Sequence, residues 1–98
     1  MKTLKVIENQ VKSAVRQGLN TMGWWNWHNI QSLGSVRGLA DRTAIKNGVV
    51  LWIECKAPGK KLSPKQDEFM KKIIKAGGHY IVARSFKDVR DYINDHGL

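Results

Sequence analysis

The sequence predicts a small α/β (α+β) domain in which a mixed sheet is flanked by helices. Its 98 residues, 42% of them hydrophobic, are enough for one modest core. Helical and extended apolar patterns alternate along the chain, and an Asn-Gly pair separates two of the extended ones. We therefore expect a single domain over residues 1–98, in the order helix, three strands, helix, strand, helix.

The chain is predicted to begin with an amphipathic helix over residues 3–22, because apolar side chains recur there at helical spacing. Gly23 ends this pattern, and the aromatic-rich residues 24–30 favour a strand. Glycine and serine then predict a loop over residues 31–38. The expected buried stripe of the helix consists of Leu4, Ile7, Val11, Ala14, Val15, Leu19 and Met22.

A β-hairpin is predicted around Asn47-Gly48, a pair that suits a two-residue turn with positive φ at both positions. Counting outward from this turn places Asp41 directly opposite Glu54, on the same face of the sheet. Lys56 follows Glu54 by two residues, so its side chain points the same way. The turn chemistry alone therefore predicts that two acids and a lysine lie together.

The second half of the chain predicts a helix, a strand and a last helix. Ser63 is the expected N-cap of the first of these helices, with Pro64 in its first turn and Gln66 at the capping-box position. A strand over residues 79–85 follows, and Ser85 with Asp88 suggests the cap of the last helix. The apolar faces should consist of Phe69, Met70, Ile73 and Ile74, with Gly77 ending that helix, and then of Val89, Tyr92 and Ile93.

The charge of the chain points to a polyanionic partner, nucleic acid first and an anionic membrane surface second. Seventeen basic residues against eight acidic ones give a formal net charge of +9. No apolar stretch is long enough to span a membrane, and the first residues do not form a signal peptide. Cys55 is the single cysteine, which excludes an internal disulfide and fits a reducing compartment, so we expect the cytoplasm of a bacterial or phage-infected cell.

The predicted pair of acids has two interpretations. Like charges directly opposite each other destabilise a sheet, and a divalent cation such as Mg²⁺ would offset that repulsion. Alternatively, Asp41, Glu54 and Lys56 form a solvated patch with an ordinary ion pair. The apolar run 49–53 indicates a strand covered on both faces, which favours the first interpretation because the acids lie where that strand emerges.

The motif residues resemble a nuclease family. Asp41 followed by Glu54-Cys55-Lys56 matches the loose PD-(D/E)xK signature. The longer string GLAD…NGVVLWIECKAPGKKLSPKQ strongly resembles the VRR-NUC (virus-type replication-repair nuclease) branch, and the resemblance extends from Glu8 to about Ala83. It implies a restriction-endonuclease-like core, and its coverage suggests a minimal stand-alone member, as in phages.

The resemblance also implies roles for individual residues. Asp41, Glu54 and the main-chain carbonyl of Cys55 would bind Mg²⁺ or Mn²⁺, and Lys56 would orient or activate the attacking water. Gln66 matches the motif glutamine beside the site, although it also fits a purely capping role. Glu8 matches the glutamate of the first helix and would complete the site through metal or water.

Two features of this sequence depart from that pattern or lie outside it. Arg42 stands where an apolar residue is usual after the aspartate, and the predicted register turns it toward the side of Ile53. Trp24, Trp25 and Trp27 are expected in the core or at a dimer interface rather than as base-stacking platforms. The residues expected to contact DNA phosphates are Arg37, Lys60, Lys61 and Lys65.

The function predicted from these residues is a metal-dependent, structure-selective DNA endonuclease. The resemblance points to four-way (Holliday) junctions as substrate, and symmetric cutting would require a homodimer with two sites. A nuclease acting on flaps or other branched DNA is one alternative, and a non-catalytic, basic nucleic-acid-binding module is another. A sequence-specific restriction enzyme is disfavoured, because the chain is too short for a separate recognition domain.

Overall fold

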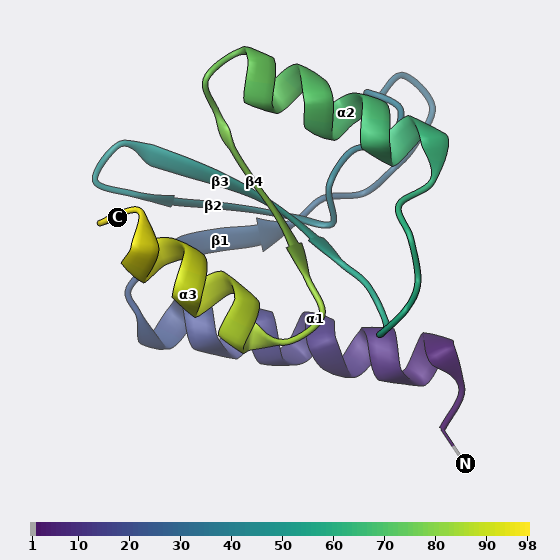
Figure 1. The fold of residues 1–98 in the computed structure, drawn as a ribbon, viewed down its shortest axis with the longest axis horizontal. Helices are drawn as coiled ribbons and strands as arrows, with labels where there is room; N and C mark the ends of the chain where they lie inside the picture. Colours follow the sequence, from purple (N-terminus) through teal and green to yellow (C-terminus); the bar gives the residue numbers. More distant parts are fainter. Residues whose placement is uncertain (1) are drawn as a thin grey trace.

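The computed structural model describes residues 2–98 and contains three helices and four strands in the predicted order (Figure 1). The first half consists of α1 (Leu4–Thr21), β1 (Trp25–His28), β2 (Arg42–Lys46) and β3 (Val49–Cys55). The second half consists of α2 (Pro64–Lys75), β4 (His79–Ala83) and α3 (Phe86–Asp95). Along these residues, no helix is both long and apolar enough to cross a lipid bilayer.

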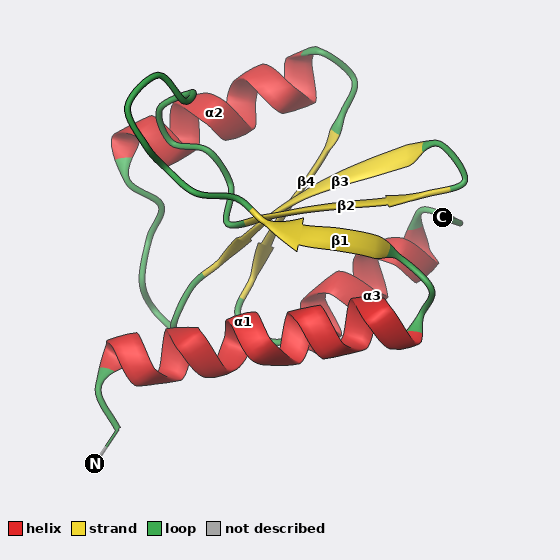
Figure 2. Cartoon of the chain, turned by 180° about the vertical axis from the view of Figure 1, so that it is seen from behind, coloured by secondary structure: helices red, strands yellow, loops and turns green. Residues whose placement is uncertain are grey.

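The four strands form one mixed sheet in the order β1-β2-β3-β4. The pairs β1–β2 and β2–β3 are antiparallel, whereas β3 and β4 are parallel and are joined through α2. Helices α1 and α3 cover one face of the sheet, and α2 covers the other face (Figure 2). The predicted fold class, a small mixed sheet flanked by helices, is therefore confirmed.

The register of the hairpin is the one that the turn predicts. Asn47 and Gly48 have φ angles of 51° and 79°, as a tight hairpin turn requires. At the far end of the hairpin Arg42 lies opposite Ile53, so Asp41 is the residue just before β2. The Arg42 side chain is partly buried, and its guanidinium donates a hydrogen bond to Asn26 Oδ1 at 2.8 Å, which offsets the cost of placing an arginine on this face.

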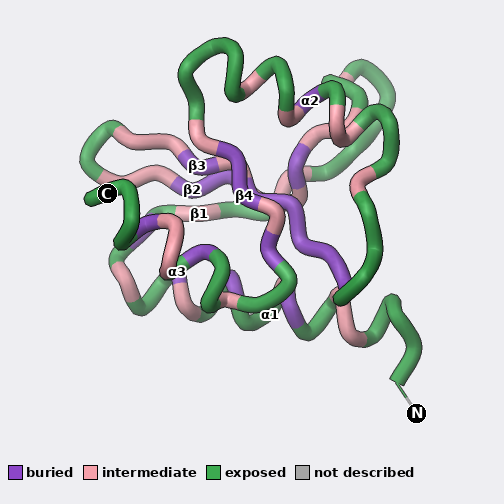
Figure 3. Tube along the Cα trace, in the orientation of Figure 1, coloured by how far each residue is buried: buried purple, intermediate pink, exposed green. Residues whose placement is uncertain are grey.

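Two apolar cores lie on the two faces of the sheet, and Figure 3 shows the buried segments meeting along the central strands. The larger core joins α1 and α3 to the sheet, and its fully buried side chains include Val15, Leu19, Leu51, Ile53 and Ile93. The smaller core lies under α2 and is built on Ala40, Phe69 and Tyr80. The expected stripe of α1 is only partly confirmed, because Leu4 and Ala14 are exposed.

The predicted ends of the later helices are confirmed in one case and corrected in the other. Ser63 and Gln66 form a complete capping box at the start of α2. Ser85 is the N-cap residue of α3, but its side chain makes no capping hydrogen bond to any described residue. Asp88 instead accepts a hydrogen bond from the Arg84 N–H at 2.8 Å.

Of the remaining apolar predictions, one is wrong and one is confirmed in part. Ile74 was expected on the buried face of α2, but its side chain is 56% exposed, because Ile73 faces the smaller core and the next residue of a helix is turned away by about 100°. Trp24 is buried in the larger core, whereas Trp25 and Trp27 project from the edge strand β1 and are 72% and 39% exposed. Trp24 is therefore a core residue as expected, and the dimer interface expected for the other tryptophans stays a prediction.

Candidate functional site

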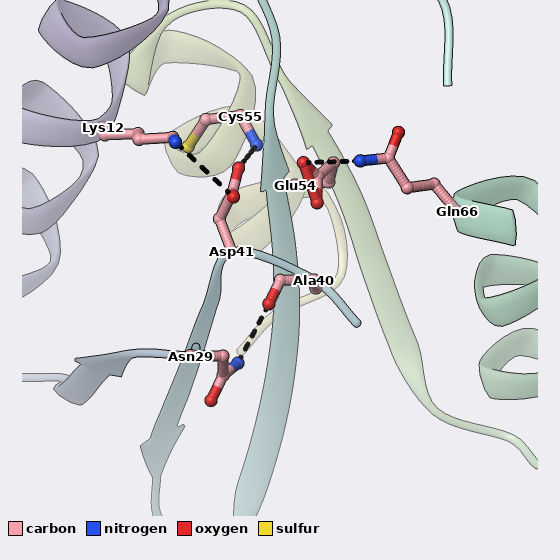
Figure 4. A network of polar contacts seen from close by, with 7 residues as sticks. All are labelled: Lys12, Asn29, Ala40, Asp41, Glu54, Cys55 and Gln66. Atoms are coloured by element: carbon pink, nitrogen blue, oxygen red, sulfur yellow. Dashed lines mark hydrogen bonds and ion pairs between the residues drawn. The ribbon is translucent and has the colours of Figure 1, made fainter. Parts of the chain in front are cut away.

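Asp41 is held at the end of the hairpin by the backbone of the neighbouring strand. Its Oδ2 atom accepts a hydrogen bond from the Cys55 N–H at 2.8 Å (Figure 4). Lys12 of α1 approaches the other oxygen, with 3.7 Å between its Nζ and Asp41 Oδ1. Both carboxylate oxygens of Asp41 therefore have positively polarised partners, which fix the orientation of the side chain.

The loop that precedes Asp41 is closed at its base by Asn29. The Asn29 side-chain amide donates to Ala40 O at 3.1 Å and to Thr43 Oγ1 at 2.7 Å. The Asn29 N–H donates to Asp41 O at 2.7 Å. These three bonds fix the backbone on both sides of Asp41, and so fix the point from which its side chain extends.

Glu54 is a buried acid close to Asp41, as the hairpin register predicts. Only 3% of its surface is exposed. The pKa of Glu54 is raised to about 9, first by burial and then by the neighbouring Asp41, against the opposing charges of Lys56 and Lys12. Its Oε1 atom is buried and has no hydrogen-bond partner among residues 2–98.

Gln66 has the two roles that the sequence left open, because it caps α2 and contacts the site. Its Oε1 atom accepts a hydrogen bond from the Ser63 N–H at 2.9 Å. Its Nε2 atom donates to Glu54 Oε2 at 3.4 Å (Figure 4). The capping box therefore orients the amide so that its donor end faces the buried acid.

Lys56 and Cys55 are buried where β3 ends. Lys56 is only 6% exposed, and its ammonium is near enough to Glu54 to lower the pKa of that acid. Cys55 points into the larger core, as predicted, and burial followed by the charges of Asp41 and Glu54 raises the pKa of its thiol to about 12. The thiol therefore stays protonated, and only main-chain atoms of Cys55 are available to a cation.

Glu8 lies on α1 one helical turn before Lys12, and so on the same side of the helix as the lysine that reaches Asp41. Its Oε1 atom is buried and lacks a hydrogen-bond partner within the described chain. Between Lys2 and Leu98, however, no three His, Cys, Asp or Glu side chains are gathered as a ready metal cluster. The structure brings together Asp41 and Glu54, and it does not bring Glu8 into a third ligand position.

These donors still fit a hard divalent cation. Mg²⁺ is usually bound through one or two carboxylates and keeps several waters, so a third protein carboxylate is not required. The unpartnered Glu54 Oε1 atom and the raised pKa of this acid both indicate a position that lacks positive charge. A cation bound there would provide that charge, in competition with the proton.

The two acids open onto a cleft of about 640 Å³. One wall is the loop before Asp41, and the other is the first turn of α2 with Ser63, Lys65 and Gln66. The walls touch at Gly38, whose φ is 74°. A Cβ atom added to Gly38 would lie only 2.0 Å from Lys65 O. Gly38 is therefore required for the loop to approach the helix this closely.

The predicted phosphate contacts divide into two groups. Arg37 and Lys65 line the cleft. Lys60 and Lys61 are exposed on the segment between β3 and α2, and neither belongs to the described lining of the cleft. The structure therefore places two of these four basic residues beside the acids.

Three polar residues near the site were not identified from the sequence, namely Lys12, Asn29 and Tyr80. The Tyr80 hydroxyl is buried without a partner in the described part of the chain. Burial raises the pKa of Tyr80, and the charges of Glu54 and Asp41 raise it further. Of the three, only Lys12 had a sequence signal, its position four residues after Glu8 on one helix face.

Comparisons with known proteins agree with this geometry. A solved structure described as a VRR-NUC domain superposes with a TM-score of 0.77 at 23% sequence identity, covering 94% of this chain and 98% of the other, and so has the same fold. No curated protein matches the chain. The family model of the VRR-NUC domain matches residues 25–87, more than half of the chain and all of the segment from Asp41 to Gln66. The chain therefore belongs to the VRR-NUC family, whose members are nucleases of the PD-(D/E)xK type.

Proposed function

We propose that this protein is a divalent-metal-dependent DNA endonuclease that cuts branched DNA, with the four-way junction as its preferred substrate. The observation that supports this proposal is the pair of close acids, Asp41 held by the Cys55 N–H and Glu54 with a raised pKa, in a cleft that is also lined by Arg37 and Lys65. The net charge of +9 suits a polyanionic substrate.

In the proposed site, Asp41, Glu54 and the main-chain carbonyl of Cys55 hold Mg²⁺ or Mn²⁺, and Glu8 contributes through a bound water. When bound, the cation stabilises charge on the phosphate and lowers the pKa of water. Gln66 keeps the Glu54 carboxylate in position through its 3.4 Å contact. Glu54 must lose its proton to bind the cation, and the neighbouring Lys56 favours that ionised form.

Lys56 is the proposed water-orienting residue. Lys56 is buried, so its side chain loses little conformational freedom when it contacts the attacking water or the scissile phosphate. Arg37 and Lys65 on the cleft walls bind neighbouring phosphates, and Lys60 and Lys61 extend this basic track along the segment before α2.

The proposed assembly is a homodimer, because symmetric cutting of a junction requires two sites related by a two-fold axis. Strand β1 is an edge of the sheet, and its exposed Trp25 and Trp27 rings lie 4.9 Å apart. This pair of large apolar side chains on an unpaired edge supports a dimer interface there. The double substitution Trp25→Ala with Trp27→Ala should convert a dimer into a monomer in sedimentation experiments.

The first test uses labelled four-way junction, flap, duplex and single-stranded DNA in Mg²⁺, Mn²⁺ or EDTA. The wild type should make paired nicks in the junction only with metal. Lys56→Ala and Asp41→Asn should abolish cutting but retain DNA binding. Lys75→Ala, which removes an exposed lysine at the far end of α2, is the matched control and should cut normally. Salt-dependent binding without cutting in any metal would contradict the proposal and favour a non-catalytic binding module.

A further inference from the structure

Leu33 is an unusual part of the cleft wall, because it is fully exposed. Its relative exposure of 104% is the largest of any large hydrophobic residue described, and Ile30 and Val36 on the same loop are 72% and 60% exposed. Isolated exposed leucines are common on protein surfaces. Three exposed apolar side chains lie within seven residues, on the loop whose Leu33 lines the cleft of the buried Glu54 and the partly buried Asp41, and such a cluster indicates a specific partner.

The loop presents Leu33 without using it for packing. Ser35 N–H donates to Ser32 O at 3.0 Å, which closes a turn with Leu33 and Gly34 in its centre. Gly34 has a φ of 88°, which suits glycine at the third position of such a turn. Gln31 braces the loop, since its Nε2 atom donates to Val36 O at 3.0 Å and its Oε1 atom accepts from the Leu39 N–H at 3.2 Å. The turn is therefore held by polar contacts that do not involve the leucine side chain.

The position of the turn relates Leu33 to the site. Leu33 lines the same cleft as Asp41 and Glu54, and so do the basic residues Arg37 and Lys65. The close contact between Gly38 and the Lys65 carbonyl fixes this loop against α2. A ligand that reaches the acids would therefore meet an exposed apolar side chain, presented by a hydrogen-bonded turn, in a cleft that Arg37 and Lys65 also line.

We propose that Leu33 is a wedge that stacks against, or inserts beside, the unpaired or partly unstacked base at a branch point of DNA. This inference rests on the proposed nuclease function and assigns the recognition of branched DNA to one side chain. Leucine is among the apolar residues that proteins insert between base steps, and the flanking cations suit the adjacent phosphates. Base stacking is already interrupted at a branch, so insertion costs less there than within a continuous duplex.

The test places 2-aminopurine either at the branch point of a junction or inside one of its arms, in EDTA so that no cutting occurs. Wild-type protein should raise the fluorescence of the branch probe about two- to fivefold and leave the arm probe unchanged, because only the branch base loses its stacking. Leu33→Asn should remove this rise and lower junction affinity about tenfold, while duplex affinity stays within about twofold. Leu4→Asn, the same exchange at an exposed leucine of α1 outside the cleft lining, is the control and should behave as the wild type.

The outcomes separate the wedge from the nuclease function. If the wild type cuts junctions but Leu33→Asn cuts them equally fast with the same probe signal, the wedge is overturned and the nuclease stands. If the wild type raises the branch-probe signal through Leu33 but cuts nothing in any metal, the wedge stands and the nuclease proposal fails. If Leu33→Asn instead changes a dimer into a monomer without altering the probe signal, a second copy of the chain covers Leu33 and the wedge is overturned.

Discussion

The two faces of the sheet differ in what they bury. The face under α1 and α3 holds the larger core, whose members are apolar apart from the protonated thiol of Cys55. The face under α2 has a smaller apolar core and also buries Glu54 and the unpartnered hydroxyl of Tyr80. Burying an acid without full compensation costs stability. The larger apolar core therefore contributes the burial that offsets the cost of the buried polar groups on the other face.

The largest effect should follow from changing the acid on the α2 face. In Glu54→Gln we expect metal-dependent cutting to fall about 1,000-fold, roughly 4 kcal/mol of barrier, because a neutral amide replaces a cation ligand. The protein should remain folded, since the substitution keeps the volume and removes a buried acid. Cleavage rates under single-turnover conditions measure the effect. Glu68→Gln, the same exchange on the exposed side of α2, is the control and should retain activity. Activity retained in Glu54→Gln would remove this residue from the metal site.

The next effect concerns the opposite face, where a substitution should lower stability and leave the cutting rate of the folded protein unchanged. Leu51 is fully buried in the larger core, so Leu51→Ala should lower the free energy of unfolding by about 2–5 kcal/mol. Urea unfolding measures this loss, and Ile74→Ala on the exposed part of α2 should change stability by less than about 0.5 kcal/mol. Any residual folded fraction of Leu51→Ala should cut DNA at the normal rate. A folded but inactive Leu51→Ala would contradict the division between the two faces.

The sequence was most informative where local backbone chemistry decides the structure. The turn at Asn47-Gly48 sets the hairpin register, and that register alone brings Asp41 and Glu54 together. The capping box predicts the start of α2 and hence the place from which Gln66 reaches Glu54. Both predictions needed only a turn type, a cap and the alternation of side chains along a strand.

The parts that could not be predicted depend on how separate elements dock. Lys12 reaches Asp41 only because of the way in which α1 packs against the sheet, which the local sequence of α1 does not specify. Tyr80 approaches the acids because β4 pairs with β3 in parallel, which no local pattern specifies. The exposure of Ile74 was not predicted either, because helical spacing does not tell how wide a stripe of the helix is covered.

A further effect should appear as a difference in pH dependence between the wild type and Glu54→Gln. The pKa of Glu54 is raised from its ordinary 4.5 to about 9, so the folded protein keeps a proton that the unfolded chain releases. Without metal, this residue's contribution to stability is therefore full below about pH 4.5 and declines up to about pH 9, by at most about 1.4 kcal/mol per pH unit.

Urea unfolding of both proteins in EDTA, from pH 5 to pH 9, tests this sign. The stability of Glu54→Gln relative to the wild type should increase as the pH rises, because glutamine has no proton to lose. Metal affinity of the wild type should also increase with pH over this window, since cation and proton compete for the same carboxylate. Parallel stability curves for the two proteins would show that Glu54 is ionised in the folded state at neutral pH.

The smallest effect concerns Lys12, which connects the two faces because it belongs to α1 but approaches an acid of the candidate site. Its pair with Asp41 is long, at 3.7 Å, and partly exposed, so Lys12→Met should lower metal-free stability by no more than about 1 kcal/mol.

The effect of Lys12→Met on metal binding should have the opposite sign, because the ammonium of Lys12 repels a cation bound at Asp41. We expect Mn²⁺ affinity to rise about two- to tenfold in Lys12→Met at low salt. Titration calorimetry measures it, with Lys5→Met on the exposed part of α1 as the control. Weaker Mn²⁺ binding in Lys12→Met would instead mean that the lysine holds Asp41 in its metal-binding position, which would make α1 part of the site rather than only its support.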